Sequence, residues 1–287
     1  MAAPPSKAKI SLSPTESTLL ITLQARYLDS QSPFPILNDT FAGPILSKID
    51  YDFSGIGVGS TTMGIVGIRG SLLDRWVINF LSNHPNGVTV VHLACGLETR
   101  AHRLAAHYAW RKVRWIDIDL PDVVKLRNEL VPAPSSEVEG GVLDYTLLAG
   151  SAFDVELITS LPNDRPTIIV MEGLAPYFTI QDNQRLLSTL CGHFKRGEIV
   201  FDAINWFIVA TRKITGYARQ TNSTVQLELD NPKVLESAHP GLTLLEARPV
   251  WVEQDVVRLP LVARFIMWIS SLFDMTRGGV QCLRFEF

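Results

Sequence analysis

Runs of apolar residues divide this chain into short strands and longer amphipathic segments. Residues 88–93, V-T-V-V-H-L, are rich in valine and leucine, which favour strands. Residues 167–171, T-I-I-V-M, form a nearly continuous apolar run, as expected for a strand buried on both faces. Similar runs elsewhere bring the number of predicted strands to seven. The other five are 113–119, 142–148, 197–204, 242–252 and 282–287.

Helical spacing of apolar residues fills the segments between these strands. It is clearest in residues 71–83, where Leu72, Trp76 and Phe80 recur every four positions. Asp39 or Thr40 is a possible cap for a second short helix. The other predicted helices are 15–31, 36–49, 121–130, 154–161, 179–194 and 259–274. Strands that alternate with helices predict an α/β fold whose sheet is covered on both faces.

The composition suits one large folded domain. The chain has 287 residues, of which 46% are hydrophobic, and its net charge is −3. A general nucleic-acid binder normally carries a basic surplus, so we expect no nucleic-acid partner. Three widely spaced cysteines predict neither a disulfide framework nor a zinc site, and they favour a reducing compartment such as the cytoplasm.

Four segments lie outside the regular pattern. Residues 1–14 are expected to form a short flexible arm, and 205–240 are expected to be helical lid pieces broken by prolines. The glycine-rich stretch 55–70 predicts either a mobile connection or a loop that closes over a ligand. The apolar run 259–273 is too short to span a bilayer and predicts a buried or lid helix. We therefore expect no stable membrane insertion, although contact with a membrane surface stays a minor alternative.

The turn after the strand at 88–93 is built from small residues. Ala94, Cys95 and Gly96 let a ligand approach the backbone, and Thr99 is a possible cap for the helix that follows. Strand, turn and helix together make the entry unit of a doubly wound domain, whose ligand binds at the strand's carboxyl end. A dinucleotide fingerprint is absent because this turn reads A-C-G-L-E-T rather than G-x-G-x-x-G.

Charged residues follow several of the strands. Asp119 ends the second strand, where a carboxylate can accept hydrogen bonds from ribose hydroxyls or cap the next helix. Asp117 points to the same face, where it lines the pocket or orients the loop. Glu172 follows a buried strand and needs a cationic partner or a capping role. Arg69, just before the helix at 71–83, could bind a carboxylate or form a surface ion pair.

Other kinds of site have no support in the sequence. The six histidines show no metal-ligand spacing, so no metal site is predicted. The glycine-rich stretch lacks the Gly-Lys-Ser/Thr ending of a phosphate-binding loop. No G-x-S-x-G elbow is present, which argues against a serine hydrolase of the α/β type.

Three motifs in order resemble the leucine carboxyl methyltransferase family and its relatives in polyketide biosynthesis. They are V-V-H-L-A-C-G-L-E-T-R-A-H-R-L, W-I-D-I-D-L-P-D-V-V-K-L-R-N-E-L and I-V-M-E-G-L-A-P-Y-F-T, within residues 88–180. The resemblance implies a class I, Rossmann-like methyltransferase fold with an antiparallel C-terminal strand and a helical lid. It also implies one domain, in which 88–204 bind the cofactor. The flanking parts would be 1–87 as an N-terminal cap, 205–240 as a lid insertion and 241–287 as C-terminal strands and helix.

The same resemblance implies S-adenosylmethionine as cofactor and assigns residues to it. Arg69 would hold the methionine carboxylate, Asp119 the ribose, and Glu172 would lie beside the methionine part. The remaining cofactor residues would be the loop of Ala94, Cys95 and Gly96 and, at the adenine, Ser151 and Ala152. Tyr177 lies where the family has a tyrosine near the pocket. The chain departs from the family at Ala94, Glu98 and Ser151, and a basic residue is not evident in its N-terminal helix.

The expected activity is O-methylation of a small, polyketide-like or aromatic molecule of secondary metabolism. A carboxylate acceptor needs no general base, whereas a phenol or enol needs one, and Tyr177 is the catalytic candidate. Four aromatic residues would line the acceptor pocket or belong to the ordinary core: Trp206, Phe207, Phe265 and Trp268. The alternatives are methylation of a protein C-terminal carboxylate and non-methylating chemistry, such as cyclisation or elimination, on the same fold. The sequence does not indicate an oligomeric state.

Overall fold

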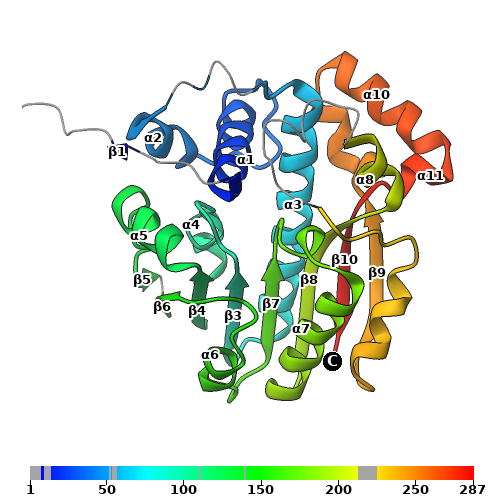
Figure 1. Cartoon of the computed structure of the whole chain (residues 1–287). Helices are drawn as coiled ribbons and strands as arrows, with labels where there is room; N and C mark the ends of the chain where they lie inside the picture. The colour runs from blue at the N-terminus through cyan, green and yellow to red at the C-terminus, as the bar shows by residue number, and fades with distance from the viewer. Residues whose placement is uncertain are drawn as a thin grey trace, which may run out of the picture.

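A single eight-stranded sheet organises the computed structural model, which describes residues 8–9, 14–51, 53, 57–109, 111–138, 140–212 and 225–287. Figure 1 shows the sheet crossing the lower half of the molecule, with its central strands ending below the N-terminal helices. In spatial order the strands are β5 (Glu137–Val138), β6 (Gly141–Ala149), β4 (Lys112–Asp119), β3 (Val88–Leu93), β7 (Thr167–Met171), β8 (Gly197–Ile204), β10 (Val280–Glu286) and β9 (Thr243–Pro249).

All seven predicted strands are present, and β5 is a two-residue addition at one edge. The pairs β6–β4, β4–β3, β3–β7 and β7–β8 are parallel. Strand β10 is antiparallel to both of its neighbours, β8 and β9. The predicted class I methyltransferase sheet, mostly parallel with an antiparallel C-terminal strand, is therefore confirmed. A separate pair joins β1 (Ala8–Lys9) to β2 (Ile49–Asp50).

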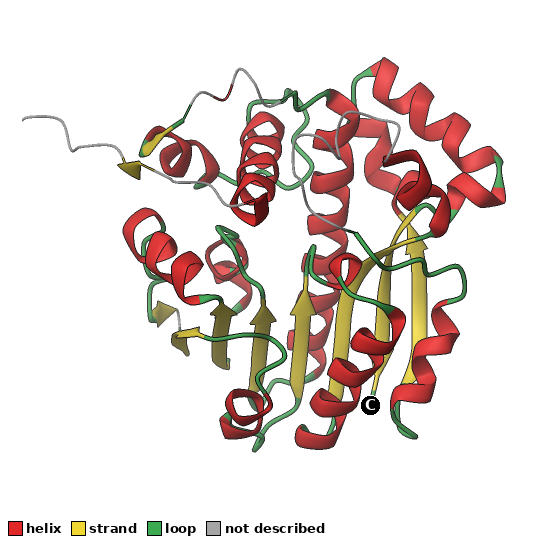
Figure 2. Ribbon diagram, viewed as in Figure 1, coloured by secondary structure: helices red, strands yellow, loops and turns green. Residues whose placement is uncertain are grey.

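Helices cover both faces of the sheet (Figure 2). One apolar cluster packs α3 and α10 against one face, and a second packs α6 and α7 against the other. Every residue of β3 and β7 is buried between them, as their continuous apolar sequences require. The α-helices are α1 (Pro14–Ser30), α2 (Ala42–Ser47), α3 (Ser60–Asn83), α4 (Arg100–Arg103), α5 (Pro121–Leu130), α6 (Val155–Ser160), α7 (Ile180–His193), α8 (Trp206–Arg212), α10 (Leu261–Leu272) and α11 (Asp274–Arg277).

A third, smaller apolar cluster joins the N-terminal helices to the turn after β3 and the end of α5. Leu20 and Leu23 of α1 and Ile45 of α2 pack with Leu97 and Leu130. Leu97 belongs to the turn after β3, and Leu130 ends α5. The N-terminal helices therefore rest on the carboxyl edge of the sheet, which is the edge where parallel α/β sheets bind ligands.

The expectation of a loop over residues 55–70 was wrong from Ser60 onward, because α3 begins there and runs for 24 residues. Its glycines are packing positions. A Cβ on Gly64 would lie 2.6 Å from Leu259 Cδ1, and one on Gly70 would lie 3.2 Å from Leu37 Cδ1. Tertiary contacts thus override the low helix propensity of glycine. Arg69 consequently lies inside this helix rather than before it.

The side chains predicted to cap two helices do not make the expected cap hydrogen bonds. The second helix is shorter than 36–49, and its N-cap is Phe41, with no side-chain cap. Asp39 instead pairs with Arg26. Thr99 occupies the N-cap position of α4, but its hydroxyl donates to Asp39 at 2.7 Å. Both positions serve a buried polar cluster, described below. By contrast, Thr179 caps α7, accepting from the Asp182 N–H at 3.1 Å.

The C-terminal third departs from prediction in three places. Pro232 does not break a helix but begins the 3-10 helix η4 (Pro232–Ala238), where its missing N–H costs nothing. Strand β9 ends at Pro249, and the 3-10 helices η5 (Val250–Val252) and η6 (Gln254–Arg258) follow. The helix expected at 259–274 as a buried or lid helix is α10; it is not buried, because only Ala263 and Met267 of it are.

No helix among the described residues is both long and apolar enough to span a membrane. The arm expected at residues 1–14 lies almost wholly outside the described residues, as does the segment 213–224 of the expected lid.

Candidate functional site

The turn after β3 has an unusual backbone. Ala94 has φ of 52° and Gly96 has φ of 51°, both in the left-handed region. For alanine this conformation costs about 1–2 kcal/mol, whereas glycine adopts it without strain. The Cys95 N–H donates to the Ile118 carbonyl at 3.2 Å, which fixes the turn to the end of β4. Cys95 itself is buried, and burial raises the pKa of its thiol well above the usual value, so it is not a reactive thiolate.

Asp119 supports this turn from the neighbouring strand. One carboxylate oxygen accepts from the Gly96 N–H at 2.6 Å, and the other accepts from the Leu120 N–H at 2.7 Å. Burial raises the pKa of Asp119, and these backbone hydrogen bonds oppose that rise. The alternative role as a helix cap is not observed, because Leu120 is the N-cap of α5 and no side chain caps that helix.

Asp117 orients the loop from beneath, one of the two roles predicted for it. It accepts from Arg127 at 2.6 Å, from the Trp115 indole at 2.6 Å and from the Tyr145 hydroxyl. Arg127 in turn donates to the carbonyls of Gly96, at 2.9 Å, and Glu98, at 2.6 Å. Burial alone would raise the pKa of Asp117, but Arg127 and these hydrogen bonds hold it well below its usual value.

Arg69 lies between two carboxylates at the ends of β7 and β8. Its Nε donates to Glu172 Oε1 at 3.0 Å, and its Nη1 donates to Asp202 Oδ2 at 3.1 Å. Asp202 also accepts from the Gly173 N–H at 2.5 Å. Burial would raise the pKa of Glu172, but the charges of Arg69 and Arg100 outweigh it and the pKa is lowered. Arg69 therefore forms a buried ion-pair cluster rather than a surface pair.

A second group of arginines extends this cluster, and sequence reasoning missed it. Arg100 donates to Asp74 and to Glu172, both at 2.5 Å, and lies 3.3 Å from the His92 ring. Arg103 pairs with Asp74 at 3.1 Å and with Glu98. The spacing of Arg100 and Arg103, one helical turn apart, is a local signal that they share a partner. Their partner Asp74 is on α3, and no local pattern indicated it.

Arg26 ties the N-terminal helix α1 to the same loop. It pairs with Asp39 and donates to the Leu97 carbonyl at 2.9 Å. Asp39 also accepts from Thr99. Arg26 was not recognised in the sequence, although it follows Leu23 by three positions and so lies on the buried face of α1. An ionised side chain on an apolar face was the signal that could have identified it.

The other predicted site residues lie around the same edge. Ser151 and Ala152 follow β6, and Ser151 Oγ accepts from the Phe153 N–H at 3.1 Å. Ala152 packs against the apolar cluster under α6 and α7. Tyr177 ends η3 (Ala175–Tyr177), the short helix after β7, and is half-buried. Predicted cofactor residues thus follow β3, β4, β6 and β7 at one edge of the sheet.

The four predicted aromatic residues divide into two pairs. Trp206 and Phe207 begin α8 directly after β8, with ring centroids 5.9 Å apart. Phe265 and Trp268 are on α10, and both are more than half exposed. They lie on the side of α10 opposite Ala263 and Met267, which face α3. The alternative that all four belong to the ordinary core was therefore wrong.

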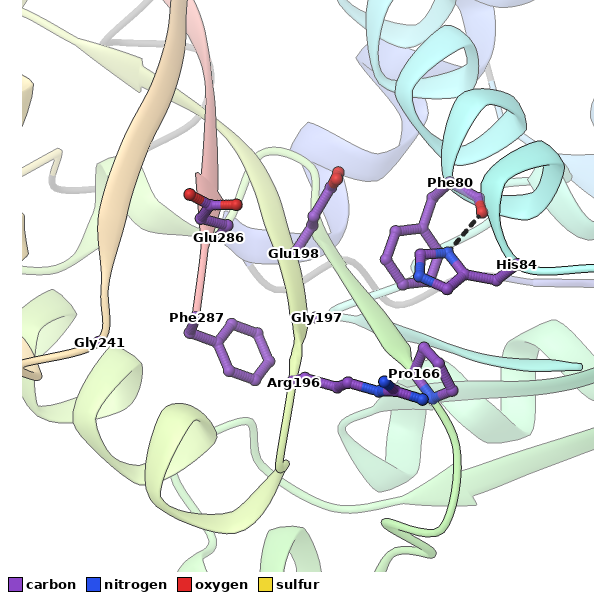
Figure 3. A pocket seen from close by; sticks show the side chains of 9 residues that line it. All are labelled: Phe80, His84, Pro166, Arg196, Gly197, Glu198, Gly241, Glu286 and Phe287. Atoms are coloured by element: carbon purple, nitrogen blue, oxygen red, sulfur yellow. Dashed lines mark hydrogen bonds between the residues drawn. The ribbon is translucent and has the colours of Figure 1, made fainter.

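One surface hollow of about 370 Å³ lies at the opposite edge of the sheet (Figure 3). It is lined by residues at the start of β8 and the end of β10, among them Gly197, Glu198 and Phe287. It contains none of the predicted site residues. Within the described residues, no group of three or more His, Cys, Asp or Glu is placed to hold a metal ion.

Comparison with known protein families distinguishes between the expected activities of this chain. The family model described as leucine carboxyl methyltransferase matches residues 20–191, which is more than half of the chain. This chain belongs to that family. The match begins within α1 and includes α3 and every strand from β3 to β7, so it contains Arg69 and Glu172 but not Asp202.

Two relatives of this methyltransferase cover nearly its whole length. One is TcmP, the tetracenomycin polyketide synthesis O-methyltransferase of Streptomyces glaucescens, 37% identical over 88% of this chain and 94% of its own. The other, dpfgK of Gibberella zeae, is an S-adenosyl-L-methionine-dependent methyltransferase, 33% identical over 95% of this chain and 94% of its own. The enzyme is therefore an S-adenosylmethionine-dependent methyltransferase, as expected.

More distant proteins agree with the fold. A protein of Thermobifida fusca assigned as a methyltransferase superposes with a TM-score of 0.54 at 13% identity, covering 91% of this chain and 93% of its own. Leucine carboxyl methyltransferase 1 of Kluyveromyces lactis is 26% identical over 44% of each chain. That shorter match leaves more than half of this methyltransferase unaligned with the enzyme that gives the family its name.

Proposed function

We propose that this enzyme transfers a methyl group to an oxygen atom of a small, polyketide-like or aromatic molecule. The observation that supports it most is the 37% identity to TcmP, because the aligned region takes in 94% of a polyketide O-methyltransferase. We also propose that the chain is one functional domain, with 88–204 as its cofactor-binding core and the flanking segments covering that core.

The residues at the carboxyl edge fit S-adenosylmethionine. The amino-acid end of this cofactor carries both a carboxylate and an ammonium group, so its site must offer both charges. Arg69, Glu172 and Asp202 form such a mixed cluster. We assign Arg69 to the carboxylate and Glu172 to the ammonium group. The protein's guanidinium and carboxylate groups are already buried side by side, so only the charges of the cofactor have to leave water on binding.

The rest of the cofactor is assigned to the loops beside this cluster. Asp119 would accept from the ribose hydroxyls, since each carboxylate oxygen has a second lone pair beyond the backbone bond it already makes. The turn of Ala94, Cys95 and Gly96 would lie against the cofactor. Ser151 and Ala152 are assigned to the adenine edge. When bound, S-adenosylmethionine supplies a methyl group on a positively charged sulfur, which is already activated for transfer.

The protein's task is then to position the acceptor oxygen and keep water away from it. We assign Trp206 and Phe207 to the acceptor pocket, because they directly follow β8, which carries Asp202. Phe265 and Trp268 face away from this edge, and we assign them a different role below. Tyr177 is the candidate base for a phenol or enol acceptor; a carboxylate acceptor is ionised at neutral pH and needs none.

Calorimetric titration with S-adenosylmethionine and, separately, NADH tests the cofactor assignment. Glu172→Gln keeps the size of the side chain but removes its charge, so we expect at least a tenfold loss of affinity, or about 1.4 kcal/mol. The matched control is Glu198→Gln, which removes a carboxylate paired with Arg284 at 2.8 Å, outside the site. Equal binding by Glu172→Gln and wild type would contradict the assignment.

Transfer of a labelled methyl group tests the substrate class. The panel contains aromatic acids, phenols, enolic polyketides and a peptide ending in leucine. Alkali releases a methyl group from a carboxylate ester but not from a phenol ether, so treatment of the product identifies the acceptor oxygen. Methylation of the peptide alone would favour the protein carboxylate alternative. Cofactor binding with conversion of a substrate but no labelled product would favour non-methylating chemistry.

A further inference from the structure

The helix α10 presents an apolar surface to solvent. Leu261 is 77% exposed, Phe265 58%, Trp268 56% and Leu272 56%. In Figure 1 this helix lies at the outer edge of the molecule, away from the sheet. Nine large apolar side chains between residues 261 and 275 are classed as exposed: Leu261, Val262, Phe265, Ile266, Trp268, Ile269, Leu272, Phe273 and Met275. We call this set the α10 surface.

The α10 surface is larger than a solitary protein normally exposes. Three of the nine side chains are aromatic, offer about 150–250 Å² each and are 56–60% exposed, so these three alone present roughly 350 Å². Six aliphatic side chains, each at least 40% exposed, enlarge the surface further. The largest apolar patch of a typical monomer is about 300–600 Å². A standard protein interface buries about 800 Å² on each partner. The α10 surface therefore supplies a large part of the area that a stable dimer needs.

The order of side chains along α10 is self-complementary. Leu261, Phe265, Trp268 and Leu272 follow one another at spacings of four, three and four residues, which places them in one stripe along the helix. If two copies pack antiparallel about a two-fold axis, leucine meets leucine at the ends and phenylalanine meets tryptophan at the centre. A two-fold interface requires such reciprocity, because each contact occurs twice.

The charges at the two ends of α10 also suit an antiparallel pair. Arg258 precedes the helix, is half exposed and already pairs with Asp255, while Asp274 and Arg277 follow the helix and are exposed. Antiparallel packing brings Arg258 of one copy near Asp274 of the other, and it aligns the helix dipoles favourably.

We propose that the α10 surface is the interface of a symmetric homodimer, in which the two α10 helices pack antiparallel across the two-fold axis. The proposal does not depend on the substrate. It assigns Phe265 and Trp268, whose ring centroids are 5.9 Å apart, to the centre of the interface. In this arrangement the cofactor edges of both subunits stay open, because the Arg69 cluster lies on the carboxyl edge of the sheet and not on α10.

Sedimentation velocity across a hundredfold range of concentration tests the dimer. We expect the wild type to sediment with twice the 31.9 kDa mass of the chain, and the double variant Phe265→Glu/Trp268→Glu as a monomer. Both side chains are exposed, so the variant should fold and still bind S-adenosylmethionine. The control is Val155→Glu on α6. Val155 is 56% exposed and lies outside the α10 surface, so this variant should stay dimeric. A monomeric wild type, or a dimer unaffected by the double variant, would overturn the proposal.

Disulfide trapping tests the antiparallel arrangement. In the double variant Leu261→Cys/Leu272→Cys the two positions are eleven residues apart on one helix, too far for a bond within a chain. Oxidation should therefore link two chains, whereas Leu261→Cys alone should not. The three native cysteines are buried, so the wild type gives the background level of linking between chains. Strong linking of the single variant would indicate parallel helices and contradict the proposal.

Binding to vesicles distinguishes a membrane from a second copy. The wild type is sedimented with vesicles of zwitterionic lipid and with vesicles that also contain anionic lipid. We expect no binding to either, because the dimer covers the surface. If a monomeric wild type binds vesicles and Phe265→Glu/Trp268→Glu does not, the α10 surface is a membrane-contact site and the dimer is refuted.

Discussion

The side chains under the turn after β3 form one connected network of buried charges. Arg127 joins Asp117 to the carbonyls of Gly96 and Glu98, so the position of the loop depends on a carboxylate one strand away. Sequence reasoning placed Asp117 and Asp119 on one face correctly, since strand periodicity is local. It could not pair Asp117 with Arg127, because two side chains on different elements meet only once the fold exists.

The substitution Asp117→Asn should destabilise the enzyme at neutral pH. It leaves Arg127 buried without its counter-ion, and breaking such a pair costs about 3 kcal/mol. Because the pKa of Asp117 is lowered in the folded state, its contribution is complete above the unfolded value near 3.8 and declines as the pH falls further. Urea unfolding of both proteins should show a constant difference from pH 8 to 5, and a smaller one below 4. A difference that grows in acid would contradict this assignment.

At the scale of elements, the helices were harder to predict than the strands. The strands β3 and β7 are buried on both faces, so their apolar runs identify them directly. The first turns of α3 were taken for a loop because glycine has a low helix propensity. What makes them helical is contact with Asp29 and Ile36 at Gly67 and with Leu259 at Gly64. Such contacts depend on residues far along the chain and leave no trace in a local pattern.

Alanine substitutions at two helical glycines separate the effect of helix propensity on stability from the effect of side-chain packing. A Cβ on Gly192 of α7 meets nothing within 4 Å, so Gly192→Ala should raise the free energy of unfolding by about 0.5–1 kcal/mol. Gly64→Ala gains the same propensity, but its Cβ would lie 2.6 Å from Leu259 and 3.0 Å from Met267. It should therefore give no gain or a net loss. Equal stabilisation in urea unfolding would show that α3 and α10 are not in close contact.

For the molecule as a whole, the order of strands in the sheet differs from their order in the chain. Strand β10 pairs with β8 on one side and β9 on the other. Phe285 of β10 stacks on Phe201 of β8, with ring centroids 5.7 Å apart. The alternating pattern at 282–287 predicted this strand, and the family resemblance predicted its antiparallel direction. The attachment of β9 through β10 alone was not predicted.

The substitution Phe285→Ala should therefore affect two strands at once. Removal of a fully buried ring costs about 3–5 kcal/mol. Because β9 is held in the sheet by β10, its amides should lose hydrogen-exchange protection together with those of β10, while β4 and β6 keep theirs. Phe34→Ala, at a residue that is 70% exposed, is the control and should change little. If the β9 amides keep their hydrogen-exchange protection in Phe285→Ala while the β10 amides lose theirs, β9 does not depend on β10.

This strand order also bears on how the protein is made. A ribosome produces β9 before β10, so β9 emerges when its neighbour in the finished sheet does not yet exist. Until β10 follows, β8 has an unpaired edge and β9 has no strand partner in the sheet. Open strand edges of this kind recruit other chains. The nascent methyltransferase is consequently most prone to aggregate between the synthesis of β9 and that of β10, and this is the interval in which a chaperone would protect it.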